Sequence, residues 1–564
     1  MALIHRINLN FGFVLNTFYC KCIVNIKRCK TEYNIKNQAN IKHGENKYMT
    51  FEQMLKFRQI QAKRSILVKV AENHIHDLEK FCTKYVNIQK IFFYNTTNDK
   101  CFVLLELITE KDVEIFRKLA SCKINPNYAH SVTPLFLYKT INMLNNNKLS
   151  KNSSIFKPPS ANQVKETLER KNSVSEQMVS LYNMLKITDL DTRLRFFTAE
   201  QISYYLSRLF TNLSVIPFGS SVNGFGQIGC DLDLLCRTCI FNVNNSSKRF
   251  LYMTQPVHLT ERNEQKEFLD AIGTIMKICI PGITDIRKIL EARVPIIKFF
   301  NQNTNMYCDL SSTNVVALHM SELLYAYGEM DWRVKPLIFT IRKWARNMNV
   351  TKEISGQWIT NFSLTLLILF YLQIKNILPS LNTINYYTKI SKKDWYLNWK
   401  NSIKYNDNDS LYNLLYGFFE YYSIFDFKMQ AICIKEGKVK LKQDSSPLYI
   451  YNPFDITLNV SKNITIFELA RLIDHFRKAL QILIESDEKN AIIELINLKS
   501  LKSTQIEHMW NYESDTKSNE IDNSIKKNND KIEQTQFVEK ESLNESINNV
   551  DINVLKTIEK NLIK

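Results

Sequence analysis

The stretch from residue 215 to 235 decides the fold and reads Val-Ile-Pro-Phe-Gly-Ser-Ser-Val-Asn-Gly-Phe-Gly-Gln-Ile-Gly-Cys-Asp-Leu-Asp-Leu-Leu. It begins as an apolar strand, enters a turn at Gly219 and Ser220, and resumes as a second strand at Asp231. A turn of this kind offers backbone N–H groups and a hydroxyl to an anion. Glycine is needed because a Cβ would block the close approach of a phosphate. The stretch therefore predicts a phosphate-binding turn between two strands.

Two carboxylates, Asp231 and Asp233, follow that turn. Residues two apart on a strand leave the same face, with about 7 Å between their Cα atoms. Such a pair repels itself unless a cation lies between its members, and Mg²⁺ prefers oxygen ligands of this kind. A solvated strand face is the simpler alternative, but Leu232, Leu234 and Leu235 indicate a strand of the core. We therefore interpret the pair as functional.

A third acid, Asp309, lies in the short apolar run from Asn305 to Leu310. Two metal ions bridged by three carboxylates suit nucleotidyl transfer. One ion activates the attacking hydroxyl, and the other holds the triphosphate and the leaving group. The three aspartates together form a candidate catalytic centre, although Asp309 alone would indicate little.

The composition is that of a large, basic, globular protein. Its 564 residues and 66.3 kDa allow three or four domains at about 150 residues each, and a hydrophobic fraction of 45% suffices for their cores. The 74 Lys and Arg residues exceed the 56 Asp and Glu residues by 18, which favours a polyanionic partner such as a nucleic acid. A general bias toward Lys, Asn and Ile is the alternative explanation of the charge.

The twelve cysteines have no repeated spacing, and a CxxC formed by Cys236 and Cys239 has no second pair at a metal-site distance. This argues against a zinc site. Several others lie in apolar runs, as small buried hydrophobes do, which fits a reducing compartment. They are Cys101, Cys279, Cys308 and Cys433.

The N-terminal part predicts a targeting segment and a small module. The first 30 residues contain five Lys or Arg residues and no acid, so residues 1–45 are interpreted as a mitochondrial presequence, with a basic disordered tail as the alternative. Residues 60–140 show β-like runs at 65–70, 88–94 and 101–107, with helical stretches at 74–85 and 110–119, as in a ferredoxin-like sandwich. An RNA recognition module (RRM) shares this topology, but the third run has no glycine and only Phe102 as an aromatic. A structural or self-association role therefore competes with RNA binding.

The rest of the chain divides into four regions that differ in composition. Residues 141–174 predict a linker, 175–315 an α/β domain with a polar surface loop at 242–265, 316–480 a helical region and 510–564 a disordered tail. Residues 362–374 are apolar but shorter than the roughly 20 residues of a membrane span. They predict a buried helix, and no transmembrane segment is expected.

The run from Phe218 to Asp233 resembles the signature of the polymerase-beta nucleotidyltransferase superfamily, and in particular of its poly(A) and poly(U) polymerases. The runs 308–311, 321–328, 358–365 and 445–454 are similar to those of the animal mitochondrial poly(A) polymerases. The resemblance covers about residues 65–480. It implies an α/β plus α fold: a nucleotidyltransferase palm, a helical poly(A)-polymerase-associated domain and an N-terminal RRM-like module.

The same resemblance implies roles for single residues. Asp231, Asp233 and Asp309 would ligate Mg²⁺ or Mn²⁺, and Asp309 would help to activate the RNA 3′-hydroxyl. The implied nucleotide contacts are Gly219 and Ser220 at the triphosphate, Gly229 and Cys230 beside the ATP, Asn314 and Ser321 at the sugar, and Arg342 and Arg346 at the phosphates. Ser363 lies where relatives place a serine before a stacking tyrosine, but Leu364 follows it here. A loop of the N-terminal module, Tyr94, Asn95 and Thr96, is a looser match.

Base choice depends on one further position. Uridylyl-selective relatives carry a histidine before an Asn-Val pair, and this chain has Leu458 before Asn459 and Val460. The apolar side chain argues against uridine without proving adenine.

We therefore expect a metal-dependent, template-independent RNA adenylyltransferase that uses ATP to extend RNA 3′ ends in the mitochondrial matrix, and that forms a homodimer as similar enzymes do. The alternatives are a terminal uridylyltransferase and a catalytically inactive RNA-binding scaffold. The presence of all three aspartates opposes the scaffold. CCA addition to transfer RNA is a third possibility, but its motifs are arranged differently.

Overall fold

The computed structural model describes residues 49–70, 74–96, 100–121, 135–138, 158–210, 213–238, 262–312, 314–352, 354, 356–390, 399, 408–487 and 489–497. All but residue 497 fall in one compact unit, residues 1–496. The predicted presequence, the predicted tail, Cys239 and most of the predicted loop at 242–265 lie outside the described residues. Of that loop, the residues from Arg262 onward begin a helix instead.

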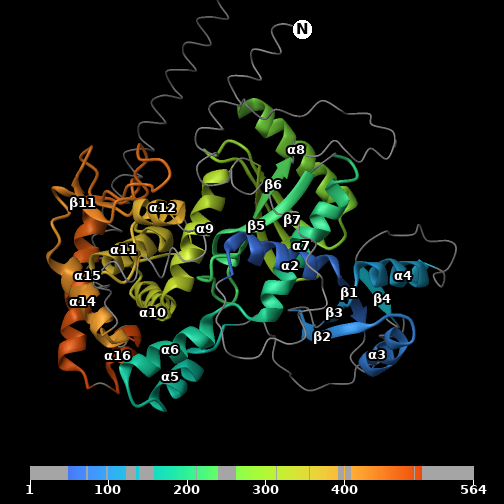
Figure 1. The fold of residues 1–564 in the computed structure, drawn as a ribbon, viewed down its shortest axis with the longest axis horizontal. Helices are drawn as coiled ribbons and strands as arrows, with labels where there is room; N and C mark the ends of the chain where they lie inside the picture. Colours follow the sequence, from blue (N-terminus) through green and yellow to red (C-terminus); the bar gives the residue numbers. More distant parts are fainter. Residues whose placement is uncertain are drawn as a thin grey trace, which may run out of the picture. The chain divides into compact units, whose positions relative to one another are not determined.

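Residues 51–138 form a helix followed by a four-stranded sheet with two further helices (Figure 1). The elements are α2 (Phe51–Lys63), β1 (Ser65–Val70), α3 (Ile75–Thr83), β2 (Ile88–Asn95), β3 (Cys101–Leu107), α4 (Glu110–Ser121) and β4 (Leu135–Tyr138). The strand order is β2-β3-β1-β4, with β4 parallel to β1 and the other neighbours antiparallel. The order of elements predicted for residues 65–119 is thus present, and β4 adds a fourth strand.

Both faces of this sheet are apolar, because buried residues follow one another along β1 and β3. One set packs under α3 and α4 and includes Ile66, Val68, Val103 and Leu105. The other set packs into the core of the palm and includes Leu67, Tyr94, Phe102 and Leu104. The Phe102 ring stacks on Tyr94 with centroids 5.6 Å apart. The face on which an RRM would stack bases is therefore covered by the palm.

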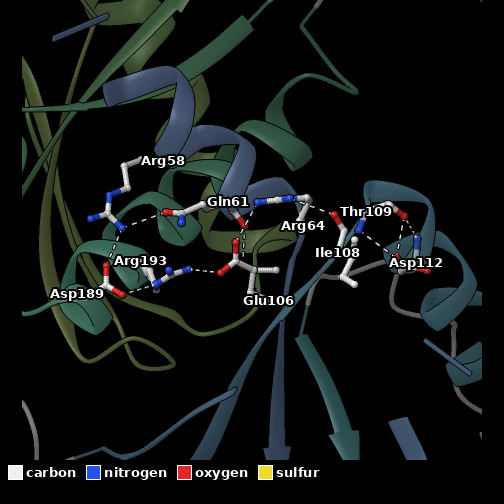
Figure 2. A network of polar contacts seen from close by, with 10 residues as sticks. Arg58, Gln61, Arg64, Glu106, Ile108, Thr109, Asp112, Asp189 and Arg193 are labelled. Atoms are coloured by element: carbon white, nitrogen blue, oxygen red, sulfur yellow. Dashed lines mark hydrogen bonds and ion pairs between the residues drawn. The ribbon is translucent and has the colours of Figure 1, made fainter. Parts of the chain in front are cut away.

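A buried acid links this module to the palm (Figure 2). Glu106 on β3 is 1% exposed and forms ion pairs with Arg64 at 3.0 Å and with Arg193 of α7 (Asp189–Leu206) at 2.6 Å. Arg193 also bonds Asp189 at 2.8 Å, and Arg58 of α2 bonds the other oxygen of that carboxylate. Each charge in this network has a partner of opposite sign, as a buried charge requires.

The palm contains a five-stranded sheet with the order β5-β6-β9-β8-β7. Its strands are β5 (Leu213–Phe218), β6 (Leu232–Thr238), β7 (Ile283–Ile289), β8 (Ile296–Asn301) and β9 (Met306–Ser311). Strands β6 and β9 are parallel, and the other neighbours are antiparallel. Leu232, Leu234, Cys308 and Leu310 share one core with side chains of α7 and α8 (Arg262–Cys279). Alternate residues of these strands, the aspartates among them, therefore lie on the opposite face.

The helical region surrounds a second core (Figure 1). Trp344 is fully buried there between Phe419 and Phe476. The elements are α5 (Ala161–Glu169), α6 (Val174–Leu185), α9 (Val315–Met330), α10 (Val334–Asn347), α11 (Asn361–Ile374), α12 (Leu381–Ile390), α14 (Leu411–Ile424), β10 (Gln430–Cys433), β11 (Lys438–Leu441), α15 (Ile466–Glu485) and α16 (Ala491–Asn497).

The linker predicted for residues 141–174 is wrong at its C-terminal end, which forms α5. Ser160 and Gln163 cap this helix reciprocally, and Val164 and Leu168, one turn apart, are buried. Both join the core of the helical region, as do buried residues of α6. The chain therefore contributes to the helical region before it enters the palm.

Two further predictions concern apolar segments. The apolar run at 362–374 is a buried helix, α11, in which every residue from 363 to 373 is buried. No helix of the described residues is long and apolar enough to cross a membrane. Cys279, predicted to be buried, is exposed, because it ends α8 at the surface.

We expect Glu106→Ala to lower the thermal stability of the protein sharply. The variant leaves the Arg193 guanidinium, whose side chain is 4% exposed, without its closest partner. Removing one member of a buried pair typically costs about 3–5 kcal/mol. The control is Lys478→Ala, which breaks the exposed pair with Asp474 and should cost about 1 kcal/mol or less. Equal melting temperatures for the two variants in calorimetry would contradict the importance of Glu106.

Candidate active site

A single row of residues crosses the five strands of the palm sheet. In the strand register Phe218 lies opposite Asp233, Asp233 opposite Asp309, Asp309 opposite Lys298 and Lys298 opposite Arg287. Neighbouring strands are about 4.8 Å apart. The second and third predicted carboxylates therefore lie side by side although 76 positions separate them in the sequence (309 − 233 = 76).

A buried arginine holds the turn that leads to these carboxylates. Arg195 of α7 is 2% exposed, and its Nη1 donates to Ser221 Oγ at 2.8 Å and to the Asp231 carbonyl at 3.0 Å. Its Nη2 donates to the Cys230 carbonyl at 2.6 Å. The guanidinium thus ties the start of the turn to its end and fixes where Asp231 leaves it. The role of Arg195 was not predicted from the sequence, although a charged side chain between the apolar Leu194 and Phe196 was a signal.

Gly219 begins the turn in a conformation that only glycine adopts easily. Its φ is +67°, and a Cβ on it would lie 2.5 Å from Asp233 Oδ2. Its N–H donates to Ser321 Oγ at 2.7 Å, and that hydroxyl donates to the Ala317 carbonyl. The missing side chain therefore makes room for a carboxylate, and α9 holds the turn in place.

The carboxylates disfavour one another's charge. Burial, then the charges of Asp309 and Asp231, raise the pKa of Asp233 to about 7. Burial and the Asp309 charge also raise the pKa of Asp231, while Lys298 and Arg195 partly oppose this. A group of carboxylates with raised pKa values is the environment that a divalent cation stabilises, because the cation favours their charged forms.

Asp309 is paired with a cation of the protein itself. Its Oδ2 accepts a hydrogen bond from the Lys298 ammonium at 2.7 Å. Among the described residues, no three His, Cys, Asp or Glu side chains are gathered closely enough to enclose a metal ion. The fit to a hard cation rests instead on the chemistry of the carboxylate oxygens and on the register that places Asp233 beside Asp309.

A cavity of about 420 Å³ opens at the β5 side of the row. The turn residues Gly219 and Ser220 lie at one wall, and helices α9, α10 and α11 supply the others. Its lining also includes Phe218, Asn223, Phe225, Asp233, Asn314, Val316, Ala317, Met320, Ser321, Leu324, Arg342, Asn361, Phe362, Thr365 and Asn452.

Most of the predicted nucleotide contacts line or adjoin this cavity. Asn314 caps α9 by accepting from the Ala317 N–H, and Ser321 lies two turns further along that helix. Arg342 donates to the Phe225 carbonyl at 2.8 Å, and burial lowers the pKa of its guanidinium. Cys230 touches the lining through its Sγ, 3.5 Å from Ser220 Oγ, and follows Gly229, which has a φ of +84°.

Besides Gly229 and Cys230, which adjoin the cavity, five predicted contacts lie outside the lining. Ser363 is 1% exposed and hydrogen-bonded to Thr360 inside the first turn of α11, and Arg346 lies one turn beyond Arg342. Tyr94 is turned into the palm core, where its hydroxyl donates to the Asn303 carbonyl, and Asn95 and Thr96 follow it in the same hairpin. The hairpin packs against the β8–β9 turn, which explains its distance from the cavity lining.

One aromatic residue of the cavity, Phe362, was also not predicted from the sequence. Phe362 is 37% exposed and lines the cavity one position before Ser363. It offers a ring to the cavity, whereas Leu364 stands at the position of the family's stacking tyrosine. The sequence shows that Phe362 belongs to the run 358–365. The direction of its side chain depends on the cap at Thr360, which sets the rotation of α11.

Comparison with known proteins assigns the family. Residues 174–329 match the family described as the central palm domain of mitochondrial-like poly(A) RNA polymerase, and residues 410–458 match the Cid1 family of poly(A) polymerases. The human mitochondrial poly(A) RNA polymerase is 34% identical over 459 residues, which cover 78% of each chain. The chain belongs to the mitochondrial poly(A) RNA polymerases. It is accordingly a nucleotidyltransferase that adds poly(A) to RNA.

Other members of this family support the assignment. The Drosophila melanogaster enzyme is 37% identical over 341 residues, 57% of this chain and 55% of its own. A crystal structure of mtPAP in its apo form has a TM-score of 0.70 at 30% identity and covers 79% of this chain and 97% of that chain. A complex of mtPAP with ATPγS has a TM-score of 0.67 with the same coverage.

We expect Gly219→Ala to lower kcat by about 100-fold or more. A new Cβ would push the Asp233 carboxylate out of place, and a displacement of about 1 Å can cost 10²-fold in rate. The measurement is primer extension, with circular dichroism as a check on folding. The matched control is Gly437→Ala, another glycine of positive φ, on the β10–β11 turn and outside the cavity lining. Equal loss of activity in both variants would show that the effect is one of folding.

Proposed function

We propose that this poly(A) RNA polymerase transfers adenylate from ATP to RNA 3′ ends without a template and with Mg²⁺ or Mn²⁺ at Asp231, Asp233 and Asp309. The observation that carries the proposal is the strand register, which places Asp233 beside Asp309 next to the Gly219 turn. Bound divalent ions would activate the 3′-hydroxyl and stabilise the charge that develops on the phosphates.

The other residues of the site would bind the parts of the nucleotide. Ser220 and the backbone of the Gly219 turn would hold the triphosphate, and Arg342 and Arg346, one turn apart on α10, would neutralise it. Asn314 and Ser321 would contact the sugar, with Ser321 also fixing the turn. Gly229 and Cys230 would border the nucleotide. Helices α9, α10 and α11, which wall the cavity, would shield one side of the reacting phosphate from water.

Base selection would rest on two features. Phe362 supplies an aromatic surface in the cavity. Leu458 is joined to the cavity lining by a backbone hydrogen bond, since its carbonyl accepts from the N–H of the lining residue Asn452. A leucine there supplies no polar side chain to read uracil. The mtPAP structures include complexes with UTP, CTP and GTP as well as ATPγS, so the choice of base has to be measured.

The N-terminal region, proposed as an RRM-like module, would serve structure more than base recognition. The sheet face that carries Phe102 packs on the palm, and Glu106 ties the two together. We propose that the enzyme acts in the mitochondrial matrix after removal of a presequence within residues 1–45. We also propose that it is a homodimer and that its charge of +18 favours RNA phosphates without regard to sequence.

Primer extension with each nucleoside triphosphate in turn tests the activity. We expect ATP to give long, metal-dependent tails and the Asp231→Ala, Asp233→Ala double variant to give none while still binding RNA. Longer tails with UTP would replace the base assignment with that of a uridylyltransferase. Absence of extension by the wild-type chain under both metals, with RNA binding kept, would favour the scaffold.

The effect of pH on metal binding tests the site without an activity assay. The folded-state pKa of Asp233, about 7, lies above its ordinary value of 3.8. Ionising this group in the metal-free protein therefore lowers the free energy of unfolding as the pH rises from about 4 to 7. A divalent ion removes that penalty, so the rise in melting temperature caused by MgCl₂ should be larger above pH 7 than below it. A rise that does not depend on pH, or that persists in Asp233→Asn, would contradict the metal site.

A further inference from the structure

The cavity occupies only one end of the row that crosses the palm sheet. Its lining comes from the β5 side and from α9, α10 and α11, and Asp233 is the one sheet residue beyond β5 that it includes. No residue of β7, β8 or β9 belongs to it. The carboxylates therefore lie between the cavity and a second stretch of the same sheet face. In-line transfer requires the attacking hydroxyl and the leaving group to approach the reacting phosphorus from opposite sides.

That second stretch carries an exposed aromatic pair. Tyr307 lies two residues before Asp309 on β9, so both side chains leave the same face with about 7 Å between their Cα atoms. The Tyr307 side chain is 63% exposed. Its register partner Phe300, on β8, lies with its ring centroid 4.8 Å away. Cys308 of β9 and Leu232 of β6 are register partners. Tyr307 precedes Cys308, and Asp231 precedes Leu232, so Tyr307 is level with Asp231 as well. An exposed ring of this size beside catalytic carboxylates offers a surface for stacking.

Cations border the pair on its outer side. Lys298 follows Asp309 in the row and Arg287 ends it. The next residue, Lys288, bonds Asp270 of α8 on the covered face, so Arg287 is directed to the open face with Tyr307. Arg287 is exposed and forms no ion pair with any described residue. Aromatic rings beside cations are the surface that binds single-stranded nucleic acid irrespective of sequence.

We propose that Tyr307 and Phe300, with Arg287 at their outer edge, bind the last nucleotides of the RNA primer and direct its 3′-hydroxyl toward Asp309. The proposal rests on the proposed function, which supplies the RNA and the direction of attack. Single-stranded RNA is the occupant that fits because the surface continues directly from the carboxylates, has cations for the phosphates, and has rings for the bases. A poly(A) tail grows by one identical base at a time, so stacking without base reading suits it.

The test measures RNA and ATP separately with the full chain. We expect Tyr307→Ala to raise both the KM for an oligoadenylate primer and its Kd, measured by fluorescence anisotropy without ATP. Base stacking is worth about 1–3 kcal/mol, which is about 5- to 150-fold. The KM for ATP should change less than about 2-fold, because the cavity lies on the other side of the carboxylates. Tyr307→Phe should restore RNA binding, since it keeps the ring.

Two further variants make the test specific. Tyr386→Ala removes another exposed tyrosine, on α12 and away from the palm sheet, and should leave RNA affinity unchanged. Arg287→Ala should weaken binding and lower the slope of log Kd against log salt by about 0.7, the value for one phosphate of a single strand. Tyr307→Ala should leave that slope unchanged, since stacking releases no counterion.

Several results would overturn the proposal. One is unaltered RNA affinity in Tyr307→Ala, and another is a parallel rise in the KM for ATP. A change in the oligomeric state of Tyr307→Ala in light scattering, with RNA affinity kept, would assign the surface to a second copy of the chain. Failure of the proposed function would differ from all of these, because the wild-type chain would then extend no primer, whereas anisotropy would still show whether Tyr307 binds RNA.

Discussion

The parallel pairing of β6 with β9 is the constraint on which the rest of the structure depends. In that register Asp233 lies directly beside Asp309, and Leu232 beside Cys308. A slip of one residue would turn one carboxylate into the core under α7 and α8. The connection between the two strands includes α8, β7 and β8, so much of the palm serves to set this one register. The cavity lies on one side of the aligned carboxylates and the open aromatic surface on the other, so the roles of both depend on this register.

Placing three carboxylates together is costly, and the surrounding residues offset that cost. Arg195 brings a buried positive charge to the turn, and Lys298 pairs with Asp309. Both oppose the rise in the pKa of Asp231. Gly219 leaves room for the Asp233 carboxylate, and Ser321 fixes the backbone of that glycine. The site is thus assembled from a palm helix, the sheet and α9 of the helical region, all of which belong to one compact unit.

The sequence predicted what depends on local pattern. The turn, the carboxylate pair and the strands at 65–70 and 101–107 could be found from residue types and from period two, and the structure has these strands at the same bounds. Features that depend on packing between distant parts of the chain could not be predicted from the sequence. Arg195 acquires its role from a turn 26 to 36 residues further along the chain, and Lys298 from its register partner on the next strand. Helix α5 joins a core most of whose members, from Met320 onward, follow it by over 150 residues.

Positions near helix ends and sheet faces were hardest to predict. Ser363 and Phe362 are neighbours, yet the cap at Thr360 buries the first and directs the second into the cavity. Tyr94 was expected near the nucleotide because of its loop, but its ring packs in the palm core beside Phe102. In each case the role of the side chain depends on which face of its helix or strand it occupies. A shift of one residue changes that face, and sequence periodicity does not fix it.

The most direct test is a crystal structure of the protein with a non-hydrolysable ATP analogue, Mn²⁺ and oligoadenylate, with the manganese located by anomalous scattering. We expect manganese between Asp231, Asp233 and Asp309, the triphosphate at Gly219 and Ser220, and the RNA approaching from the β8 side. Manganese bound elsewhere while Lys298 still holds Asp309, or a triphosphate lying over β8, would contradict the account.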